Sequence, residues 1–300
     1  MAAPVAVIGL GIMGSRMAGR LLAAGFALRG YDPNPARSEE FEAAGGTPTS
    51  SPAEAVQGCD IALLSLLTSD ISREVCLGER GLSSSGAVSL LVLDATTGRP
   101  EDAVEIADGL AKVGIEYADT TVSGNAPVAA SGELVAMVGG SDDAYQRARP
   151  VLEAIGRSHH HVGGVGAGAR TKLIVNHVLA VNRMALAEAL VVAELAGLDL
   201  ARVLEVLKDG VAYSKAMDLW GERIIAGDHY PPSARLRHSH KDARLITEHA
   251  RALGAPTALV DVVRAALAEG EESGLADADN SAVAEVVRRR AGIGRIEVGE

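Results

Sequence analysis

The feature that most restricts the fold of this sequence is an apolar run that leads directly into closely spaced glycines. Residues 5–8 read VAVI, and residues 9–14 read GLGIMG. Helix-spaced apolar residues follow, and a second apolar run at 26–31 ends at Asp32. Strand, GxGxxG, helix, strand and acidic residue, in this order, are typical of the first βαβ unit of a dinucleotide-binding domain. The sequence therefore predicts an α/β fold that begins with a Rossmann-type, doubly wound sheet.

Each part of this unit has a physical role in holding a dinucleotide. Glycines allow a tight turn and a close approach to a pyrophosphate, and the helix start offers free N–H groups and partial positive charge. Asp32 follows the second strand, where a carboxylate can bind both ribose hydroxyls and repels a 2′-phosphate, which favours NAD over NADP. Arg29 and Arg37 could soften that preference but are interpreted first as solvated charges. The cofactor-binding residues predicted here are Gly9, Leu10, Gly11, Ile12, Met13, Gly14 and Asp32.

Strand and helix patterns alternate through the rest of the first half. Five further apolar runs predict strands, at 61–66, 87–94, 115–119, 133–138 and 157–162. Such alternation implies a parallel sheet that is covered on both faces, with ligands at the carboxyl ends of its strands. The loops expected to converge there are 9–14, 66–70, 95–98 and 120–126.

The loop at 120–126 is the most polar of these. Ser123 and Asn125 offer side-chain donors and Gly124 exposes its backbone, which together suit a carboxylate. An ordinary polar turn accounts for these residues equally well, so both interpretations stay open.

Three consecutive histidines at 159–161 invite a metal site. Neighbouring side chains of a strand point to opposite faces, so three in a row cannot converge on one ion. We interpret them as structural and predict no metal.

After Gly163 a long helical pattern begins and runs to about Ala196. Lys172 and Asn176 lie four residues apart in it, so on a helix they share one face. A lysine and an amide beside a glycine-rich approach can grip and protonate a small oxyanion. The alternative is a solvated lysine beside a capping loop.

The second half is predicted to be all-α and joined to the first through this long interdomain helix. We expect a nucleotide-binding domain at 1–164 and a substrate and dimerisation domain at 165–300. Further helices are predicted at 200–207, 217–225, 236–253, 258–269 and 281–290, with a short strand at 296–298. The apolar face of the long helix exceeds what a small bundle covers, so we expect a homodimer or homotetramer.

Lys241 lies in the middle of the helix predicted at 236–253, with His238 and Arg237 one turn before it on the same face. A second lysine here could meet a substrate anion or the cofactor. An exposed charged face is the alternative.

Composition limits the partners and the compartment. A net charge of −11 argues against binding to a nucleic acid backbone. The 2 cysteines argue against a disulfide framework and fit a reducing, cytoplasmic compartment. Polar and charged residues interrupt the apolar stretch at 173–196, so no membrane span is expected.

Taken together, these motifs resemble the β-hydroxyacid dehydrogenase family, which includes 3-hydroxyisobutyrate dehydrogenase and tartronate semialdehyde reductase. The likeness covers essentially the whole chain and is carried by its motifs in order. They are 9–18, similar to the GLGxMGxxMA signature, the substrate-binding segment 119–140, the catalytic segment 163–176, the pair Lys241-Asp242 and the C-terminal signature 279–282.

The resemblance implies reversible hydride transfer between NAD and a small hydroxyacid. Lys172 is then the general acid/base, and Asn176 helps to hold the substrate. The residues implied to bind the substrate are Ser123, Gly124, Asn125, Lys241 and His238. The residues implied to lie near the nicotinamide are Thr96, Thr97 and Lys241, and Leu66 and Leu67 are further predicted cofactor-binding residues.

Some departures from the family pattern bear on the substrate. Thr121 and Asn125 replace a proline and a glycine of the family, and Arg235, Arg237 and His238 stand where the family is apolar. These cationic groups suggest a larger or more anionic substrate than hydroxyisobutyrate. Imine reductases and NADP-preferring aldehyde-acid reductases are alternatives, as is a non-catalytic NAD-binding protein, although imine reductases generally lack a lysine at the position of Lys172. A decarboxylating 6-phosphogluconate dehydrogenase is much longer and expects a histidine where Ala169 stands.

Overall fold

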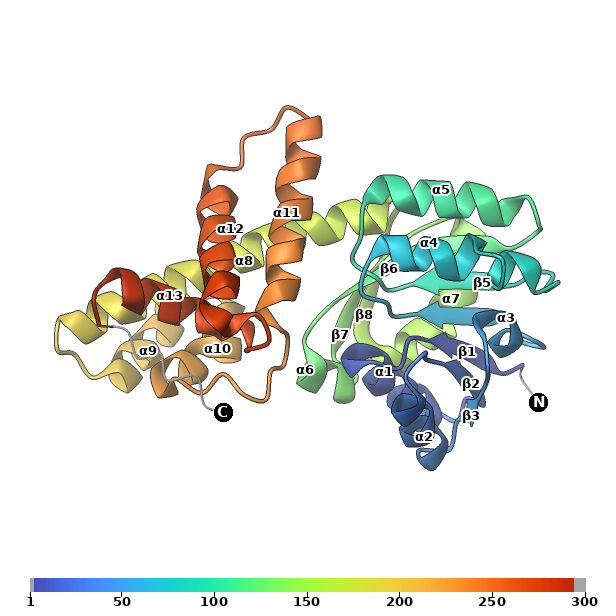
Figure 1. The fold of residues 1–300 in the computed structure, drawn as a ribbon, viewed down its shortest axis with the longest axis horizontal. Helices are drawn as coiled ribbons and strands as arrows, with labels where there is room; N and C mark the ends of the chain where they lie inside the picture. The colour runs from blue at the N-terminus through green and yellow to red at the C-terminus, as the bar shows by residue number, and fades with distance from the viewer. Residues whose placement is uncertain (1–2, 294–300) are drawn as a thin grey trace. The chain divides into compact units, whose positions relative to one another are not determined.

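The computed structural model describes residues 3–293 and divides into two compact units, Met1–Lys172 and Leu173–Glu300 (Figure 1). The boundary between the units falls inside the long helix α8 (Ala167–Leu195). The domain limits expected from the sequence, 1–164 and 165–300, stay a prediction. Each unit is described by itself.

The first unit is built on one sheet with the strand order β3-β2-β1-β4-β5-β6-β7-β8. Its strands are β1 (Val5–Ile8), β2 (Leu28–Tyr31), β3 (Thr47–Pro48), β4 (Ile61–Leu64), β5 (Leu91–Asp94), β6 (Glu116–Ser123), β7 (Leu134–Gly139) and β8 (Gly156–Gly163). Its helices before α8 are α1 (Ile12–Ala23), α2 (Pro35–Ala43), α3 (Pro52–Ala55), α4 (Ser69–Leu77), α5 (Pro100–Ala111), α6 (Ala126–Ala130) and α7 (Asp142–Ile155), with a 3₁₀ turn at Leu82–Ser84.

Both faces of the sheet are buried, as the near-continuous apolar strands predict. Val5 and Val7 of β1 pack into a cluster with residues of α1 and α7, whereas Ala6 and Ile8 pack into a second cluster with residues of α4 and α5. Figure 1 shows α4 and α5 on one face of the sheet and α1 on the other. The alternation of side chains along β1 thus fills two cores, and the doubly wound fold is confirmed.

The strand order reverses at β1, which pairs in parallel with β2 on one side and β4 on the other. Val7, for example, lies opposite Gly30 and Leu63. In sheets of this kind, ligands bind beyond the carboxyl ends of the strands at such a reversal. The GxGxxG loop, which follows β1 directly, therefore occupies the expected binding position.

The expectation that 120–126 is a loop is wrong for its first residues, because β6 continues to Ser123. Asp119 lies opposite Asp94 in a parallel pairing, and residues 119–123 also pair with β7 in the antiparallel direction. Thr120 and Thr121 are fully buried. The sheet is consequently mixed rather than wholly parallel. The strand expected at 87–94 is also shorter, since β5 begins only at Leu91.

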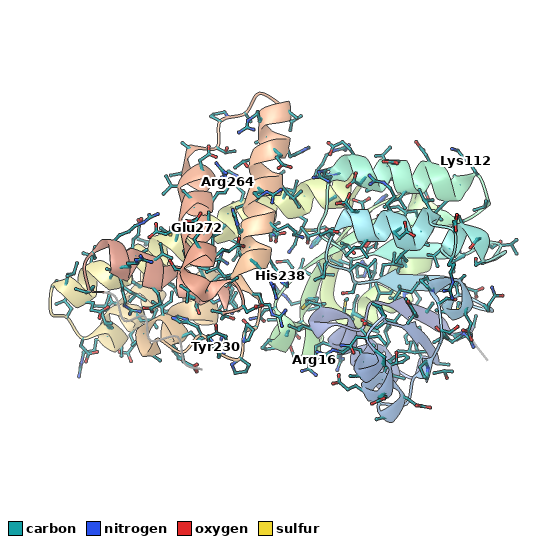
Figure 2. The ribbon with its side chains drawn as sticks, in the orientation of Figure 1. Arg16, Lys112, Tyr230, His238, Arg264 and Glu272 are labelled. Atoms are coloured by element: carbon teal, nitrogen blue, oxygen red, sulfur yellow. The ribbon has the colours of Figure 1, made fainter. Side chains whose placement is uncertain are left out.

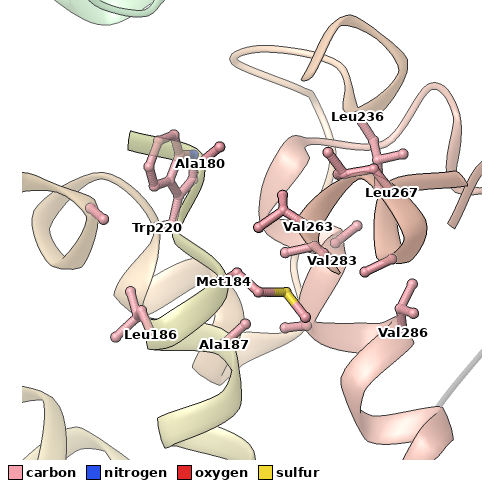
Figure 3. Packing of buried hydrophobic residues seen from close by; sticks show 14 of the residues in the cluster. Ala180, Met184, Leu186, Ala187, Trp220, Leu236, Val263, Leu267, Val283 and Val286 are labelled. Carbon is pink, nitrogen blue, oxygen red and sulfur yellow. The ribbon is translucent and has the colours of Figure 1, made fainter. Parts of the chain in front are cut away.

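The second unit is helical and follows the predicted pattern. Its further helices are α9 (Leu200–Asp209), α10 (Lys215–Ala226), α11 (Leu236–Ala252), α12 (Ala258–Gly270) and α13 (Val283–Arg290), with a π-helical turn at Glu271–Leu275 and a 3₁₀ turn at Asn280–Ala282. Figure 3 shows its core, where Met184 and Ala187 of α8 lie among residues from the other helices. The strand expected at 296–298 lies outside the described residues.

Within residues 3–293, no helix is both long and apolar enough to cross a membrane.

Candidate active site

The glycines of the loop after β1 have different physical roles. A Cβ built on Gly9, whose φ is +89°, would overlap the carbonyl oxygen of Ser65, and one on Gly14 would overlap the carbonyl oxygen of Gly9. A Cβ on Gly11 would meet nothing within 4 Å among the described residues. Gly9 and Gly14 are therefore required by packing within the protein, whereas Gly11 leaves room for a ligand to approach the backbone. Because α1 begins at Ile12, its first N–H groups suit a pyrophosphate.

Asp32 ties this loop to the end of β2. Its Oδ2 accepts a 2.8 Å hydrogen bond from the N–H of Leu10, and its Oδ1 accepts one of 2.9 Å from Asn34. The nearby arginines are engaged elsewhere, since Arg29 donates to carbonyl groups of 54–55 and Arg37 pairs with Glu40. The carboxylate is thus fixed at the position where a ribose is expected, and the residues present fit a nicotinamide dinucleotide.

A hydrogen bond joins the loop that follows β4 to the loop that follows β5. The N–H of Leu66 donates to Oγ1 of Thr96 at 3.0 Å, and the N–H of Thr96 donates to Oδ1 of Asp94 at 2.9 Å. Tyr117 Oη donates to the other carboxylate oxygen of Asp94. Burial raises the pKa of Asp94, and its hydrogen bonds oppose that rise. The structure thus brings Leu66 and Thr96 together, while Leu67 is exposed and Thr97 half-buried in the same loops.

A second link holds the same pair of loops. Ser69 Oγ donates to Asp102 Oδ2 at 2.5 Å and accepts from the N–H of Arg99. Arg73 completes the group through an ion pair with Asp102. The starts of α4 and α5 are therefore locked to each other, a connection that the sequence pattern did not reveal.

The segment after β6 is shaped by a helix cap. Oδ1 of Asn125 accepts a 3.3 Å hydrogen bond from the N–H of Val128 and so caps α6. Gly124 has a φ of +140°, a value that favours glycine. The structure thus places Ser123, Gly124 and Asn125 consecutively between β6 and α6. Their role in binding a substrate stays a prediction.

Lys172 lies in the second turn of α8, and the start of that helix is attached to β6. Asp119 Oδ1 accepts from the N–H of Gly166 at 2.7 Å, and Oδ2 accepts from the N–H of Ala169 at 2.6 Å. Thr121 Oγ1 donates to the carbonyl oxygen of Gly168 at 3.0 Å. Lys172 itself is only 8% exposed. A lysine with so little exposed surface is unusual, which favours a chemical role.

In the second unit, Asp242 binds two of the predicted site residues. Its Oδ2 accepts from Nδ2 of Asn176 at 2.9 Å, and its Oδ1 lies 3.2 Å from Nζ of Lys241. Since Asn176 lies on α8 and Lys241 on α11, this carboxylate orients groups from two helices. The sequence identified Asp242 only as part of a Lys-Asp pair.

The charge of the cationic residues before Lys241 is offset in part. Arg235 and Arg237 both pair with Asp277. His238, labelled in Figure 2, is half-buried, and burial followed by the nearby Lys241 lowers its pKa, so it is neutral at pH 7. The side chains that suggested a more anionic substrate therefore add less positive charge than their number implies.

A buried polar group accounts for the C-terminal signature at 279–282. Asp279 accepts hydrogen bonds from Ser233 and from the N–H of Ser281, and it pairs with Arg223. Burial would raise the pKa of Asp279, but these hydrogen bonds outweigh it and lower the value. The signature thus has a structural role within the helical unit.

Arg183 of α8 is an internal cation of the same unit. Its guanidinium carbon lies 5.0 Å from the ring centroid of Trp220. Burial lowers the pKa of Arg183 to about 10, against the attraction of Asp279 and Asp242. Arg183 is still charged at pH 7 and balances two carboxylates in the helical core.

Two of the three consecutive histidines in β8 have structural partners. His159 is bonded to Tyr145 Oη at 2.8 Å, and the ring of His161 stacks on the Tyr145 ring with centroids 5.0 Å apart. Among residues 3–293, no group of three or more His, Cys, Asp or Glu is placed to hold a metal ion.

A doubly wound sheet with a dinucleotide loop, followed by a long helix that carries a buried lysine near its start and continues into a helical unit, defines a class of nicotinamide-dependent oxidoreductases. Residues 4–164 match the family described as the NAD binding domain of 6-phosphogluconate dehydrogenase. Residues 166–287 match the family described as NAD-binding of NADP-dependent 3-hydroxyisobutyrate dehydrogenase. The chain therefore belongs to the β-hydroxyacid dehydrogenase family of NAD-binding oxidoreductases.

Relatives cover nearly the full length. The chain is 31% identical to 3-sulfolactaldehyde reductase of Escherichia coli over 97% of this chain and 98% of that protein. It is 32% identical to 3-hydroxyisobutyrate dehydrogenase of Pseudomonas aeruginosa over 90% and 95%. The crystal structure of 3-hydroxyisobutyrate dehydrogenase from Salmonella typhimurium superposes with a TM-score of 0.87 at 28% identity, covering 95% of this chain and 99% of that one.

Proposed function

We propose that this chain catalyses reversible hydride transfer between NAD and a small β-hydroxyacid, with Lys172 as the general acid/base. The observation that carries the proposal is the burial of Lys172 close to the start of α8, whose first turn is bound to the strand that leads into Ser123. When bound, the cofactor supplies or accepts the hydride. The residues of this chain orient the reactants and move the proton.

The proton transfer follows the direction of reaction. In oxidation, the neutral amine of Lys172 accepts the proton of the substrate hydroxyl. In reduction, the ammonium of Lys172 donates a proton to the carbonyl oxygen. Asn176 lies one turn further along α8 and is proposed to hold the reacting oxygen through its amide, which Asp242 orients. Ser123, Gly124 and Asn125 are proposed to bind the substrate carboxylate.

The cofactor end of the site is proposed to use the loops described above. Gly11 and the N–H groups of α1 would hold the pyrophosphate, and Asp32 would bind the ribose. Leu66, Leu67, Thr96 and Thr97 are proposed to lie near the nicotinamide. The carboxylate of Asp32 supports NAD over NADP, because it repels a 2′-phosphate.

The pairing of Arg235 and Arg237 with Asp277 supports a substrate with one carboxylate, similar to 3-hydroxyisobutyrate. Some relatives are named for substrates with other acidic groups, which are a sulfonate for 3-sulfolactaldehyde reductase and two carboxylates for 2-(hydroxymethyl)glutarate dehydrogenase of Eubacterium barkeri. Lys241 and His238 are the residues of this chain proposed to contact the distal part of the substrate.

A spectrophotometric screen tests this function. Small hydroxyacids with one and with two acidic groups are oxidised with NAD and with NADP in parallel, and amines are included to test the imine reductase alternative. We expect turnover of a one-carboxylate β-hydroxyacid with NAD. Turnover of amines alone would overturn the proposal, and NAD binding without turnover of any compound would favour a non-catalytic protein.

Lys172→Ala tests the acid/base assignment in the same assay. We expect the variant to bind NAD normally but to lose roughly 10²–10⁴ in kcat, the usual contribution of a positioned acid/base. Lys112→Ala is the matched control, because Lys112 is an exposed lysine on the surface of the first unit (Figure 2). Near-normal kcat in Lys172→Ala would refute the role.

We also propose that the chain associates with a second copy of itself through α8. Ile174, Val178, Val192 and Leu195 each expose more than half of their surface. Their spacing returns them to one side of a helix with 3.6 residues per turn. An apolar stripe of this kind supports a symmetric homodimer.

Both cysteines are buried and free, which supports the cytoplasmic location expected from the sequence.

A further inference from the structure

Asp119 of β6 joins the sheet to the start of α8, the helix that carries Lys172. Its side chain is 2% exposed, and each of its carboxylate oxygens accepts one backbone N–H from the start of α8. The two donors, Gly166 and Ala169, flank the first turn of the helix. They lie 47 and 50 residues along the chain from Asp119, so the contact is formed only by the tertiary fold.

Glycines make this contact possible. A Cβ on Gly168 would overlap the carbonyl oxygen of Asp119, and a Cβ on Gly139 of β7 would lie 2.5 Å from Oδ1 of Asp119. Any larger residue at either position would push the helix away from the strand. The chain therefore brings α8 close enough for backbone groups, rather than side chains, to bind the carboxylate.

Burial disfavours the ionised side chain of Asp119, and the two N–H groups at the start of α8 offset part of that cost. The first N–H groups of a helix lack partners within the helix and carry partial positive charge. A carboxylate that accepts two of them satisfies these donors and is itself compensated while buried. Asp119 therefore acts as an N-terminal cap that is supplied by a strand.

The position of this cap links it to Lys172. Lys172 follows Ala169 by three residues, so the two are neighbours on the helix surface. A shift or rotation of the first turn of α8 would move the Lys172 amine by a similar amount. Thr121, two residues after Asp119 in β6, contributes a second attachment through Gly168.

We propose that Asp119 is a positioning residue for the reaction, which fixes the first turn of α8 and thereby the place of the Lys172 amine. Asp119 does not touch the reacting atoms in this role. The kinetic part of the inference rests on the proposed function of Lys172, whereas the structural part does not.

The test compares Asp119→Asn with Thr120→Val. Asparagine keeps the size of the side chain but removes its charge, and it can accept only through one oxygen. Thr120 is the matched control because it is a fully buried neighbour on the same strand, and its hydroxyl donates to Ala118 rather than to α8.

Amide hydrogen exchange of the cofactor-free proteins measures how firmly Asp119 holds the first turn of α8. We expect the amides of residues 166–172 to exchange about 10-fold faster or more in Asp119→Asn, because Gly166 and Ala169 lose a charged acceptor. We expect no such change in Thr120→Val. Labelling of Lys172 by an amine-selective acylating reagent, followed by mass spectrometry, should change in rate in Asp119→Asn alone.

Kinetics then separate positioning from folding. We expect Asp119→Asn to lose ~10²-fold in kcat, the typical cost of a misplacement of about 1 Å, with less than about a 3-fold change in the Kd for NAD. Equal losses in Thr120→Val, or unchanged exchange at 166–172 in Asp119→Asn, would overturn the inference. If Lys172→Ala kept full turnover, the proposed function would fail instead, and the exchange result would still decide the role of Asp119 in α8.

Discussion

The backbone N–H of Leu10 donates a 2.8 Å hydrogen bond to Oδ2 of Asp32 and thereby joins the glycine loop to the end of β2. Asp32 consequently has two tasks, which are to shape the loop and to present a carboxylate where a ribose is expected. The two tasks can be separated because only the second depends on charge.

Asp32→Asn should change cofactor selectivity without unfolding the loop. The amide oxygen can still accept from Leu10, but the charge that repels a 2′-phosphate is lost. We expect kcat/KM for NAD to fall about 10-fold or more, as for a lost hydrogen bond to a charged group, and kcat/KM for NADP to rise. The ratio of the two constants, measured on one substrate, is the readout, and an unchanged ratio would contradict the assignment of Asp32.

Gly11→Ala should weaken NAD binding and leave stability nearly unchanged, whereas Gly14→Ala should lower stability. A methyl group at Gly11 meets no described residue, so we expect the free energy of unfolding to change by less than about 0.5 kcal/mol. The same methyl group should weaken NAD binding, because it fills the approach to the backbone. A methyl group at Gly14 overlaps the Gly9 carbonyl and should cost about 1–3 kcal/mol of stability or more.

Thermal unfolding and calorimetric titration with NAD distinguish the two variants. The interpretation of Gly11 would be wrong if Gly11→Ala bound NAD as tightly as the natural chain.

Asp119 should also make stability depend on pH. Burial raises its pKa to about 6 from the ordinary value of 3.8, against the hydrogen bonds from Ala169 and Gly166. Between pH 3.8 and about pH 6, the folded chain therefore keeps a proton on Asp119 that the unfolded chain has released. This contribution to stability is complete below about pH 4 and is lost as the pH rises through about 6. The shift corresponds to about 3 kcal/mol.

Urea unfolding of the natural chain and of Asp119→Asn at several pH values isolates this effect. Asp94 and Tyr117, the other titratable groups that face Asp119, are common to both proteins and largely cancel in the difference. We expect the stability of the natural chain relative to the variant to decline from pH 4 to pH 7. A constant difference would show that Asp119 does not titrate in this range.

Substitutions on the exposed stripe of α8 test the proposed self-association. We expect Val178→Glu together with Val192→Glu to convert the oligomer to single chains in sedimentation velocity, because burying two unpaired carboxylates opposes association. Val206→Glu on α9 is the control, since Val206 is equally exposed on another helix. A natural chain that sediments as a monomer at micromolar concentration would exclude the homodimer.

The parts of the fold that sequence predicted are those specified locally. The turn at Gly9 and the strand that precedes it are set by residues within a few positions of each other. The helical second half follows equally well from apolar periodicity.

The features that the sequence did not predict depend on distant partners. Thr120 and Thr121 looked like a polar loop, yet Thr121 is satisfied inside the sheet by a carbonyl group 47 residues away, at Gly168. The ion pair of Arg237 with Asp277, 40 residues further along the chain, also has no local sequence pattern. The hydrogen bond of Asp242 to Asn176 spans 66 residues and leaves no local pattern.

The course of α8 limits how this chain can be recombined with its relatives. The first unit ends at Lys172 and so contains fewer than two turns of the helix, which continues to Leu195 in the second. An isolated helical segment of that length is not stable in water. A chimaera joined at the unit boundary would therefore replace most of the helix that carries the proposed acid/base, Lys172. Exchange of helical parts between homologues should keep α8 whole and place the junction before Gly163 or after Gly197.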